Sequence, residues 1–304
     1  MDQAGLNFNP PIGQPQRVDQ HVRRIVAPNA SPMTFRGTNT YLVGQKDIAV
    51  IDPGPNDPAH LSTILNSLED NQTITHILVT HSHIDHSPLA RPLAEKTGAK
   101  IFAYGPTGAG QSEVMKTLIA SGYHGGGEGS DDEFTPDFEL RDGDELHSED
   151  WSMSIIETPG HFSNHISFAL NDSLFSGDHV MDWATSMVSP PDGDVSDFMV
   201  SCRKLLATQW RIFFPGHGAP VHNPQERVTF LIKHRISREQ QILHALKTSP
   251  ATPMQLAEKI YVETPQALLG AAARNVFAHL IDLKHRHLVD CKSAIGFDVQ
   301  YALR

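Results

Sequence analysis

The sequence has few cysteines and no long apolar run. Its 304 residues include two cysteines, Cys202 and Cys291, too few for a disulfide framework and typical of a reducing compartment. No stretch approaches the roughly 20 apolar residues that a membrane-spanning helix needs. The polar, proline-rich segment 1–20 lacks the apolar core of a secretory signal. We therefore predict a cytoplasmic protein with no membrane partner.

Charge is unevenly distributed along the chain. Residues 1–220 carry 13 Lys and Arg against 28 Asp and Glu, whereas residues 221–304 carry 11 against 7. This split predicts two units with different surfaces, a domain 1–222 and a smaller domain 223–304. The acidic first part argues against the capture of nucleic acid by charge alone.

Short apolar runs alternate with helical patterns through the first domain. Strands are predicted at 22–26, 39–44, 48–51, 74–80, 100–104, 145–146, 153–157, 166–170, 174–176 and 210–214, and helices at 56–69, 89–96 and 198–208. Segment 1–20 is rich in proline, and segment 105–150 is rich in glycine and acidic residues. We therefore expect a loose lead-in and a surface insertion at these places.

From residue 223 the pattern changes to amphipathic helices. They are predicted at 224–248, 254–261 and 268–285, followed by a β-hairpin at 288–290 and 296–301. Three helices and a hairpin are the outline of a winged helix. Such a unit binds nucleic acid or serves in packing or dimerisation, so a homodimer is one alternative.

Histidine is abundant, with 18 residues. The run Thr80-His81-Ser82-His83-Ile84-Asp85-His86 directly follows the predicted strand 74–80. His81 and His83 share one side of extended backbone, and Asp85 and His86 come after the chain has turned. Imidazole and carboxylate together form a ligand set for zinc, and also for iron or manganese.

Three later strands end in similar motifs. Glycine directly precedes His161, Asp178 and His217 in Thr158-Pro159-Gly160-His161, Ser176-Gly177-Asp178 and Phe214-Pro215-Gly216-His217. Glycine permits tight backbone paths and close approach to a ligand. A single motif of this kind is typical of a plain turn, but four of them at strand ends in one chain favour a functional site.

Together with Val50-Ile51-Asp52-Pro53-Gly54, these motifs resemble the metallo-beta-lactamase superfamily. The resemblance implies an α+β fold, an αββα sandwich over residues 1–222. It implies that His81, His83 and His161 bind one metal, that Asp85, His86 and His217 bind the second, and that Asp178 bridges the two. Asp52 would brace the ligand loops.

The segment Gly37-Thr38-Asn39-Thr40-Tyr41-Leu42-Val43-Gly44 and the added winged helix are similar to the beta-lactamase-like protein 2 group. Animal members of that group are single-strand endoribonucleases. Zinc beta-lactamases with this double ligand set usually have a cysteine in the later block. No cysteine stands there in this chain, which ranks antibiotic hydrolysis low.

The resemblance implies hydrolysis by two zinc ions, with manganese or iron as alternatives. A hydroxide that bridges the metals would attack an ester-like or phosphodiester substrate. Asp85 would orient it, and His165, with His179 behind it, is the candidate proton donor. Loops 105–135 and 180–197 are expected to select the substrate, the second through Met181, Trp183, Met187, Pro190 and Pro191.

Several functions stay open. The substrate is a small molecule or single-stranded RNA, and a ribonuclease needs basic residues near the metals, with Arg235, Arg238, Lys284 and Arg286 as candidates. A glyoxalase-II-like thioesterase needs groups that bind a carboxylate, and the apolar loop favours a lactone or another small ester. A regulator that binds DNA and senses a ligand, and a redox diiron centre, are the alternatives of a different class.

Overall fold

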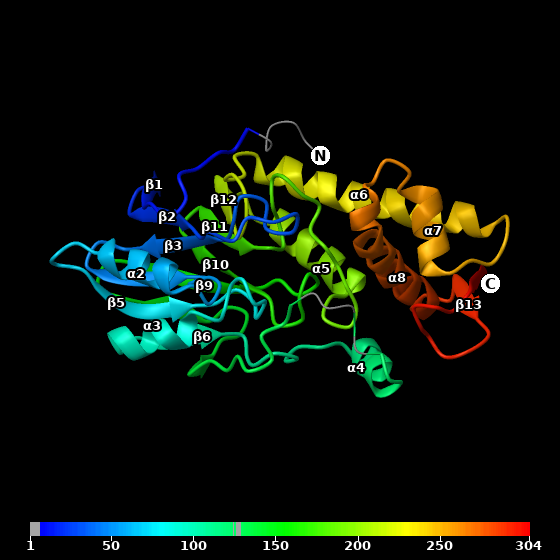
Figure 1. The fold of residues 1–304 in the computed structure, drawn as a ribbon, viewed down its shortest axis with the longest axis horizontal. Helices are drawn as coiled ribbons and strands as arrows, with labels where there is room; N and C mark the ends of the chain where they lie inside the picture. Colours follow the sequence, from blue (N-terminus) through cyan, green and yellow to red (C-terminus); the bar gives the residue numbers. More distant parts are fainter. Residues whose placement is uncertain (1–6, 124, 126–128) are drawn as a thin grey trace.

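The computed structural model describes residues 7–123, 125 and 129–304, and two β-sheets dominate the first two thirds of the chain (Figure 1). The first sheet has seven strands in this part of the chain, in the spatial order β1 (Gln16–Asp19), β2 (Val22–Val26), β3 (Asn39–Val43), β4 (Asp47–Ile51), β5 (Thr73–Leu78), β6 (Lys100–Ala103) and β7 (Phe138–Glu139). The second has the order β12 (Ile212–Pro215), β11 (Ser173–Gly177), β10 (Ile166–Leu170), β9 (Ser152–Glu157) and β8 (Glu145–His147).

The two sheets pack face to face with helices outside. Strand β3 shows the alternation that allows this, because Tyr41 and Val43 lie in the core between the sheets and Leu42 lies in the outer core. Helices α2 (Pro58–Asn66) and α3 (Ala90–Thr97) cover the outer face of the first sheet. Helices α5 (Val195–Leu206) and α6 (Pro224–Leu246) cover that of the second. The predicted αββα sandwich is confirmed.

Backbone hydrogen bonds join the two sheets at the edge where the ligand motifs lie. The amide of Asn39 donates to the carbonyl of Gly216 at 2.7 Å, and the amide of Ile166 donates to the carbonyl of Thr80 at 2.9 Å. A β-bridge also pairs Thr38 with His217. These links hold the ends of β5 and β12 close together. The side chains of the ligand motifs that follow these strands can therefore meet.

The C-terminal part has the predicted order of three helices and a hairpin. It comprises α6, α7 (Pro253–Ile260), the short 3₁₀ helix η1 (Gln266–Leu268), α8 (Leu269–His285), β13 (Val289–Cys291) and β14 (Tyr301–Leu303). Helix α6 contributes Val228 and Leu231 to the core beneath the second sheet, and Ile242 and Leu246 to the C-terminal core. One continuous helix therefore spans both cores. The boundary at 222/223 stays a prediction.

Two sequence predictions were wrong in detail. The expected lead-in 1–20 contains β1, which pairs with β2. The expected surface insertion 105–150 contains β7 and also α4 (Glu113–Ala120), whose Met115 and Leu118 are buried in the C-terminal core. A helix of eight residues gave too short an apolar pattern to be recognised, and its partners come from the far end of the chain. In the described part of the chain, no helix is both long and apolar enough to cross a membrane.

Candidate metal centre and active site

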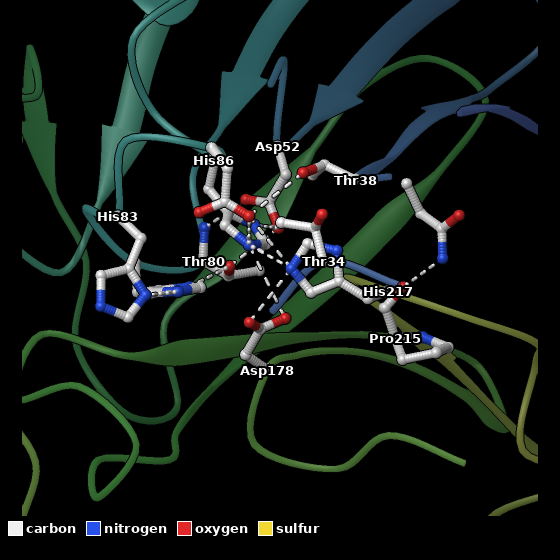
Figure 2. Close-up of polar contacts among 12 residues, drawn as sticks. Thr34, Thr38, Asp52, Thr80, His83, His86, Asp178, Pro215 and His217 are labelled. Carbon is white, nitrogen blue, oxygen red and sulfur yellow. Dashed lines mark hydrogen bonds and ion pairs between the residues drawn. The ribbon is translucent and has the colours of Figure 1, made fainter. Parts of the chain in front are cut away.

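The predicted ligands converge at one edge of the sandwich. Two groups of ligand atoms have each member within 4.8 Å of the others. The first group is His81, His83, His161 and Asp178, and the second is Asp85, His86 and His217. Figure 2 shows Asp178 facing both His217 and His86, with His83 on the far side of the cluster. The structure thus brings together all seven residues named from the sequence.

Neighbouring acceptors fix which imidazole nitrogen of His81 and of His161 faces inward. The Thr80 hydroxyl donates its proton to Asp52 at 2.8 Å, so it accepts a hydrogen bond from His81 Nδ1 at 3.0 Å. In the neutral imidazole of His81, Nε2 then carries no proton. His161 Nδ1 donates to the Met187 carbonyl at 2.6 Å. His83 Nδ1 lies 2.9 Å from His81 Nε2 and 3.2 Å from His161 Nε2.

The second group is oriented in the same way. His86 Nδ1 lies 3.0 Å from an Asp52 carboxylate oxygen, and His217 Nδ1 donates to the Gly37 carbonyl at 3.2 Å. Their Nε2 atoms lie 3.4 Å and 3.1 Å from Asp85 Oδ2. The Thr38 hydroxyl donates to the same oxygen at 3.2 Å. Backbone and side-chain acceptors therefore aim both imidazoles at one point.

Asp178 lies between the two groups. Its Oδ2 is 3.7 Å from His161 Nε2 and 3.3 Å from His217 Nε2, and its Oδ1 is 3.6 Å from His86 Nε2. Oδ1 is buried and has no hydrogen-bond partner among the residues that the structure describes. A carboxylate in this position can serve both groups at once, which is the geometry of a bridging ligand.

Asp52 joins several ligand loops. Its two carboxylate oxygens accept from the Thr80 amide and the Thr80 hydroxyl, both at 2.8 Å, and one of them contacts His86 Nδ1. Its backbone has a φ of +49°, an uncommon value for a residue other than glycine. The turn after β4 thus places the buried Asp52 carboxylate against Thr80 at the end of β5 and against the ligand His86, as the bracing role requires.

The pKa values differ between the two groups. Burial lowers the pKa of His83 to about 3, and it lowers the pKa of His81 well below its usual range. Burial also opposes charge on His217, but Asp178 and Asp85 outweigh it and raise the pKa to about 10. Burial favours a neutral Asp178, yet His217 and His86 hold its pKa well below its usual range. The three histidines of the first group are therefore neutral, whereas His86 and His217 of the second group pair with the carboxylates of Asp85 and Asp178.

This donor set fits divalent cations. His81 and His161 donate through Nδ1, so the lone pairs of both Nε2 atoms point inward, and His83 Nδ1 lies within 3.2 Å of each of them. The second group adds the Asp85 carboxylate, and Asp178 Oδ1 accepts no hydrogen bond from the described residues. Neutral imidazoles held by a hydrogen bond at the other nitrogen are the usual form of metal-ligating histidine.

A cavity of about 340 Å³ opens above the ligands. Its floor contains His83, Asp85, His161, Asp178 and His217. One wall comes from the loop after β11, with Met181, Trp183 and Met187. A further part of the lining comes from the start of α8 and the residue before it, with Leu268, Ala271, Arg274 and Asn275. The C-terminal part of the chain therefore builds part of the cavity.

The loops expected to select the substrate contribute unequally. Met181, Trp183 and Met187 line the cavity, as predicted, whereas Pro190 and Pro191 do not. No described residue of 105–135 lines it. That segment instead supports the ligand loop, since the Ile84 amide donates to the Gly129 carbonyl at 2.8 Å.

His165 does not reach the cavity. It is fully buried behind the ligands, where its Nδ1 contacts the Thr158 hydroxyl at 2.8 Å and its Nε2 accepts from the Asp178 amide at 3.2 Å. Burial and the nearby His179 lower its pKa well below the usual range. His179 is equally buried, and its pKa is about 3 because of burial. The geometry does not support the expected role as proton donor for either residue, because neither faces the space above the ligands.

The four basic residues proposed for an RNA substrate do not line the cavity. Arg235 is buried, Arg238 donates to Gln241, and Lys284 and Arg286 pair with acidic residues on the surface. Arg274 is the cation that does line it, and sequence reasoning missed it. The sequence places Arg274 near the beginning of the predicted helix 268–285, but it does not show which side of that helix faces the cavity.

Comparisons with known proteins agree with this geometry. Residues 33–218 match the metallo-beta-lactamase superfamily, and residues 252–294 match the beta-lactamase associated winged helix domain. The chain belongs to the metallo-beta-lactamase superfamily. A beta-lactamase-like protein 2 homolog of Drosophila melanogaster is 33% identical over 282 residues, which cover 88% of this chain and 89% of the relative. The predicted resemblance to that group is confirmed.

Other superfamily members extend the comparison. The atrochrysone carboxyl ACP thioesterase of Aspergillus fumigatus is 28% identical over 278 residues, covering 84% of this chain and 78% of the relative. The structure of a beta-lactamase domain protein from Burkholderia ambifaria has a TM-score of 0.78 and 20% identity, covering 98% of this chain and 96% of that one. With its His and Asp cluster, this superfamily member is a metal-dependent hydrolase.

The winged helix of this superfamily member is packed into the molecule. Ten of the 17 residues of α8, the third helix of the winged helix, are buried. The first turns of α8 form the cavity wall. This burial argues against the alternative of a regulator that inserts α8 into the major groove of DNA.

Proposed function

We propose that this chain is a binuclear zinc hydrolase of small esters or thioesters that carry a carboxylate or another anionic group. The proposal rests on one observation: residues of both ligand groups, the apolar wall and Arg274 all line the same small cavity. A volume of about 340 Å³ suits a small-molecule ligand. The two unpaired cysteines, Cys202 and Cys291, support the proposed cytoplasmic location.

The proposed ligands are His81, His83 and His161 for one metal and Asp85, His86 and His217 for the other, with Asp178 between them. When bound, two divalent cations would generate a nucleophile from water at neutral pH and stabilise negative charge on the substrate. Asp85 is partly exposed to the cavity and held by the Thr38 hydroxyl, so its carboxylate can orient that nucleophile. Among the hydroxyls at the cavity wall, those of Thr34 and Ser186 already donate to the carbonyls of Asn29 and His179, which leaves the Thr185 hydroxyl as the candidate to donate a proton to the leaving group.

The cavity walls favour a small substrate over RNA. Met181, Met187 and Trp183 offer sulfur and aromatic surface to an acyl chain, and Trp183 is held by stacking on Phe35 with ring centres 5.0 Å apart. Arg274 is the one Lys or Arg among the described residues that line the cavity. Binding to RNA usually engages several phosphates through several cations. One guanidinium suits a single carboxylate.

A panel of substrates tests the proposal. We expect zinc-loaded protein to hydrolyse a thioester with a free carboxylate faster than a neutral thioester, a lactone, a simple phosphodiester or single-stranded RNA. Metal-free protein is the control for each substrate, and reloading with manganese or iron tests the alternative metals. Faster cleavage of RNA than of any small ester would instead identify an endoribonuclease, and activity that survives removal of the metals would contradict the proposal.

Replacing Arg274 by methionine should raise KM for the carboxylated substrate about 10- to 100-fold, because a charge-assisted hydrogen bond contributes about 1.5–3 kcal/mol. We expect kcat, and hydrolysis of the neutral thioester, to change much less. Steady-state kinetics on both substrates measures the difference. Lys284→Met is the matched control, since Lys284 lies on the same helix and pairs with Asp290 away from the cavity. An equal loss on both substrates would rule out a role in recognising the anion.

A further inference from the structure

The loop that carries the apolar cavity wall is held by residues of the C-terminal part. From α6, Arg227 donates to the Met181 carbonyl at 2.7 Å and to the Ala184 carbonyl at 2.6 Å. Two turns further along α6, Arg235 donates to the Thr185 carbonyl at 3.1 Å and to the Ser186 carbonyl. The two arginines thus fasten successive carbonyls of one segment.

Helix α8 completes this attachment. Asn275 Oδ1 accepts from Arg235 at 2.8 Å and from the Val188 amide at 3.2 Å. Arg235 and Asn275 therefore hold the segment 185–188 on both sides of Met187. Because the contacts are to backbone atoms, they fix the path of the chain whatever side chains the loop carries.

The Met187 carbonyl is the group that orients His161. It accepts from His161 Nδ1 at 2.6 Å, which leaves Nε2 directed at His83 and Asp178. A displacement of this carbonyl would turn the imidazole, because the ring is held on that side by this hydrogen bond. Arg235 is thus connected to His161 through its hydrogen bonds to the Thr185 and Ser186 carbonyls, the backbone that leads on to Met187, and the hydrogen bond from His161 to the Met187 carbonyl.

We propose that Arg235 is a positioning residue for the metal ligand His161, acting with Asn275 through the segment Thr185–Val188. The proposal rests on the metal centre of the proposed function. It assigns the C-terminal part a role in building the metal site, in addition to its place in the cavity wall.

The environment of Arg235 supports this role. The side chain is 3% exposed, and its guanidinium lies 5.0 Å from the ring centre of Phe198. The oxygen atoms that it contacts in the described chain are carbonyls and one amide, and no carboxylate pairs with it. A buried cation without a counter-charge is costly. The fork of a guanidinium reaches three acceptors at once, which a lysine cannot do.

Metal affinity measured on Arg235→Lys tests the proposal. Metal-free protein is titrated with Co²⁺ against a chelating dye, and the visible spectrum follows each of the two binding steps. We expect one step to weaken about 10- to 100-fold, the usual effect of losing a partner of a metal-ligating histidine, while the other step stays unchanged. Asn275→Ala should weaken the same step. Arg238→Lys, one turn along α6 on the surface, should change neither.

The double variant separates positioning from general stability. If Arg235 acts through His161, then Arg235→Lys should have no further effect on cobalt affinity or on the spectrum once His161 is replaced by alanine. Equal weakening of both steps, or an undiminished effect without His161, would overturn the positioning role. Unaltered protein that binds two cobalt ions while Arg235→Lys changes neither step would overturn this inference alone. Failure of the unaltered protein to bind two ions would overturn the proposed function as well.

Discussion

Replacing Asp178 by asparagine should reduce hydrolysis by about 10³-fold and lower the metal content of the purified protein. The loss corresponds to about 4 kcal/mol, within the several kcal/mol that a metal centre supplies to the transition state. Asp178 contacts nitrogen atoms of both ligand groups, so the substitution removes negative charge from both. An asparagine amide also directs a donor toward the cations. The measurements are kcat/KM and elemental analysis of the same preparation.

Two further variants give this experiment its controls. Asp172→Asn removes an exposed carboxylate that pairs with Arg211 and should leave activity and metal content unchanged. Asp85→Asn changes only the second group, so we expect the first metal to remain while activity falls. Asp178→Asn protein with two metals and more than a tenth of the normal activity would show that Asp178 does not bridge the groups.

Replacing Gly216 by alanine should reduce hydrolysis by about 100-fold, although Gly216 has no side chain to contribute. A Cβ atom at this position would collide with Asp178 Oδ1 and would lie 2.7 Å from His86 Cε1. One residue from each ligand group would therefore have to move, and displacement of a catalytic group by about 1 Å can cost a factor of about 100. Overpacking of this kind also costs about 1–3 kcal/mol of stability. Activity, metal content and the free energy of unfolding are the measurements.

The matched control is a glycine with space around it. Gly270 lies in α8, and the nearest atom to an added Cβ is Arg274 Nη1 at 3.8 Å. Gly270→Ala should therefore keep both metals and stabilise the helix by up to about 1 kcal/mol. If Gly216→Ala retained full metal content and activity, the tight packing of the Pro215-Gly216-His217 turn against the ligands would have no functional importance.

The sequence predicted the ligands well because each motif is local. His81 and His83 stand two apart after a buried strand, and glycine precedes His161, Asp178 and His217 at three other strand ends. Such patterns depend on covalent spacing and on strand geometry, so they can be read without knowledge of the packing. The meeting of the motifs came from the superfamily resemblance, and the structure brings the same residues together.

The sequence predicted the supporting residues less well. It indicated that His165 lies near the site, but its burial behind Asp178 depends on how β10 and β11 pair. It also gave no reason to separate Arg274, which lines the cavity, from Arg235, which is buried, or from Lys284, which pairs on the surface. All three are basic residues of amphipathic helices.

The sequence by itself determined the motifs at the strand ends, the succession of strands and helices and the helical C-terminal part, because these follow from local spacing and from the period of the apolar residues. The αββα sandwich came from the superfamily resemblance. Only the tertiary structure decided which arginine faces the cavity and which one holds the loop beside His161. The rotation of α6 and α8 about their axes is set by packing against distant strands and loops, and a helix's own sequence constrains that rotation only to its apolar side.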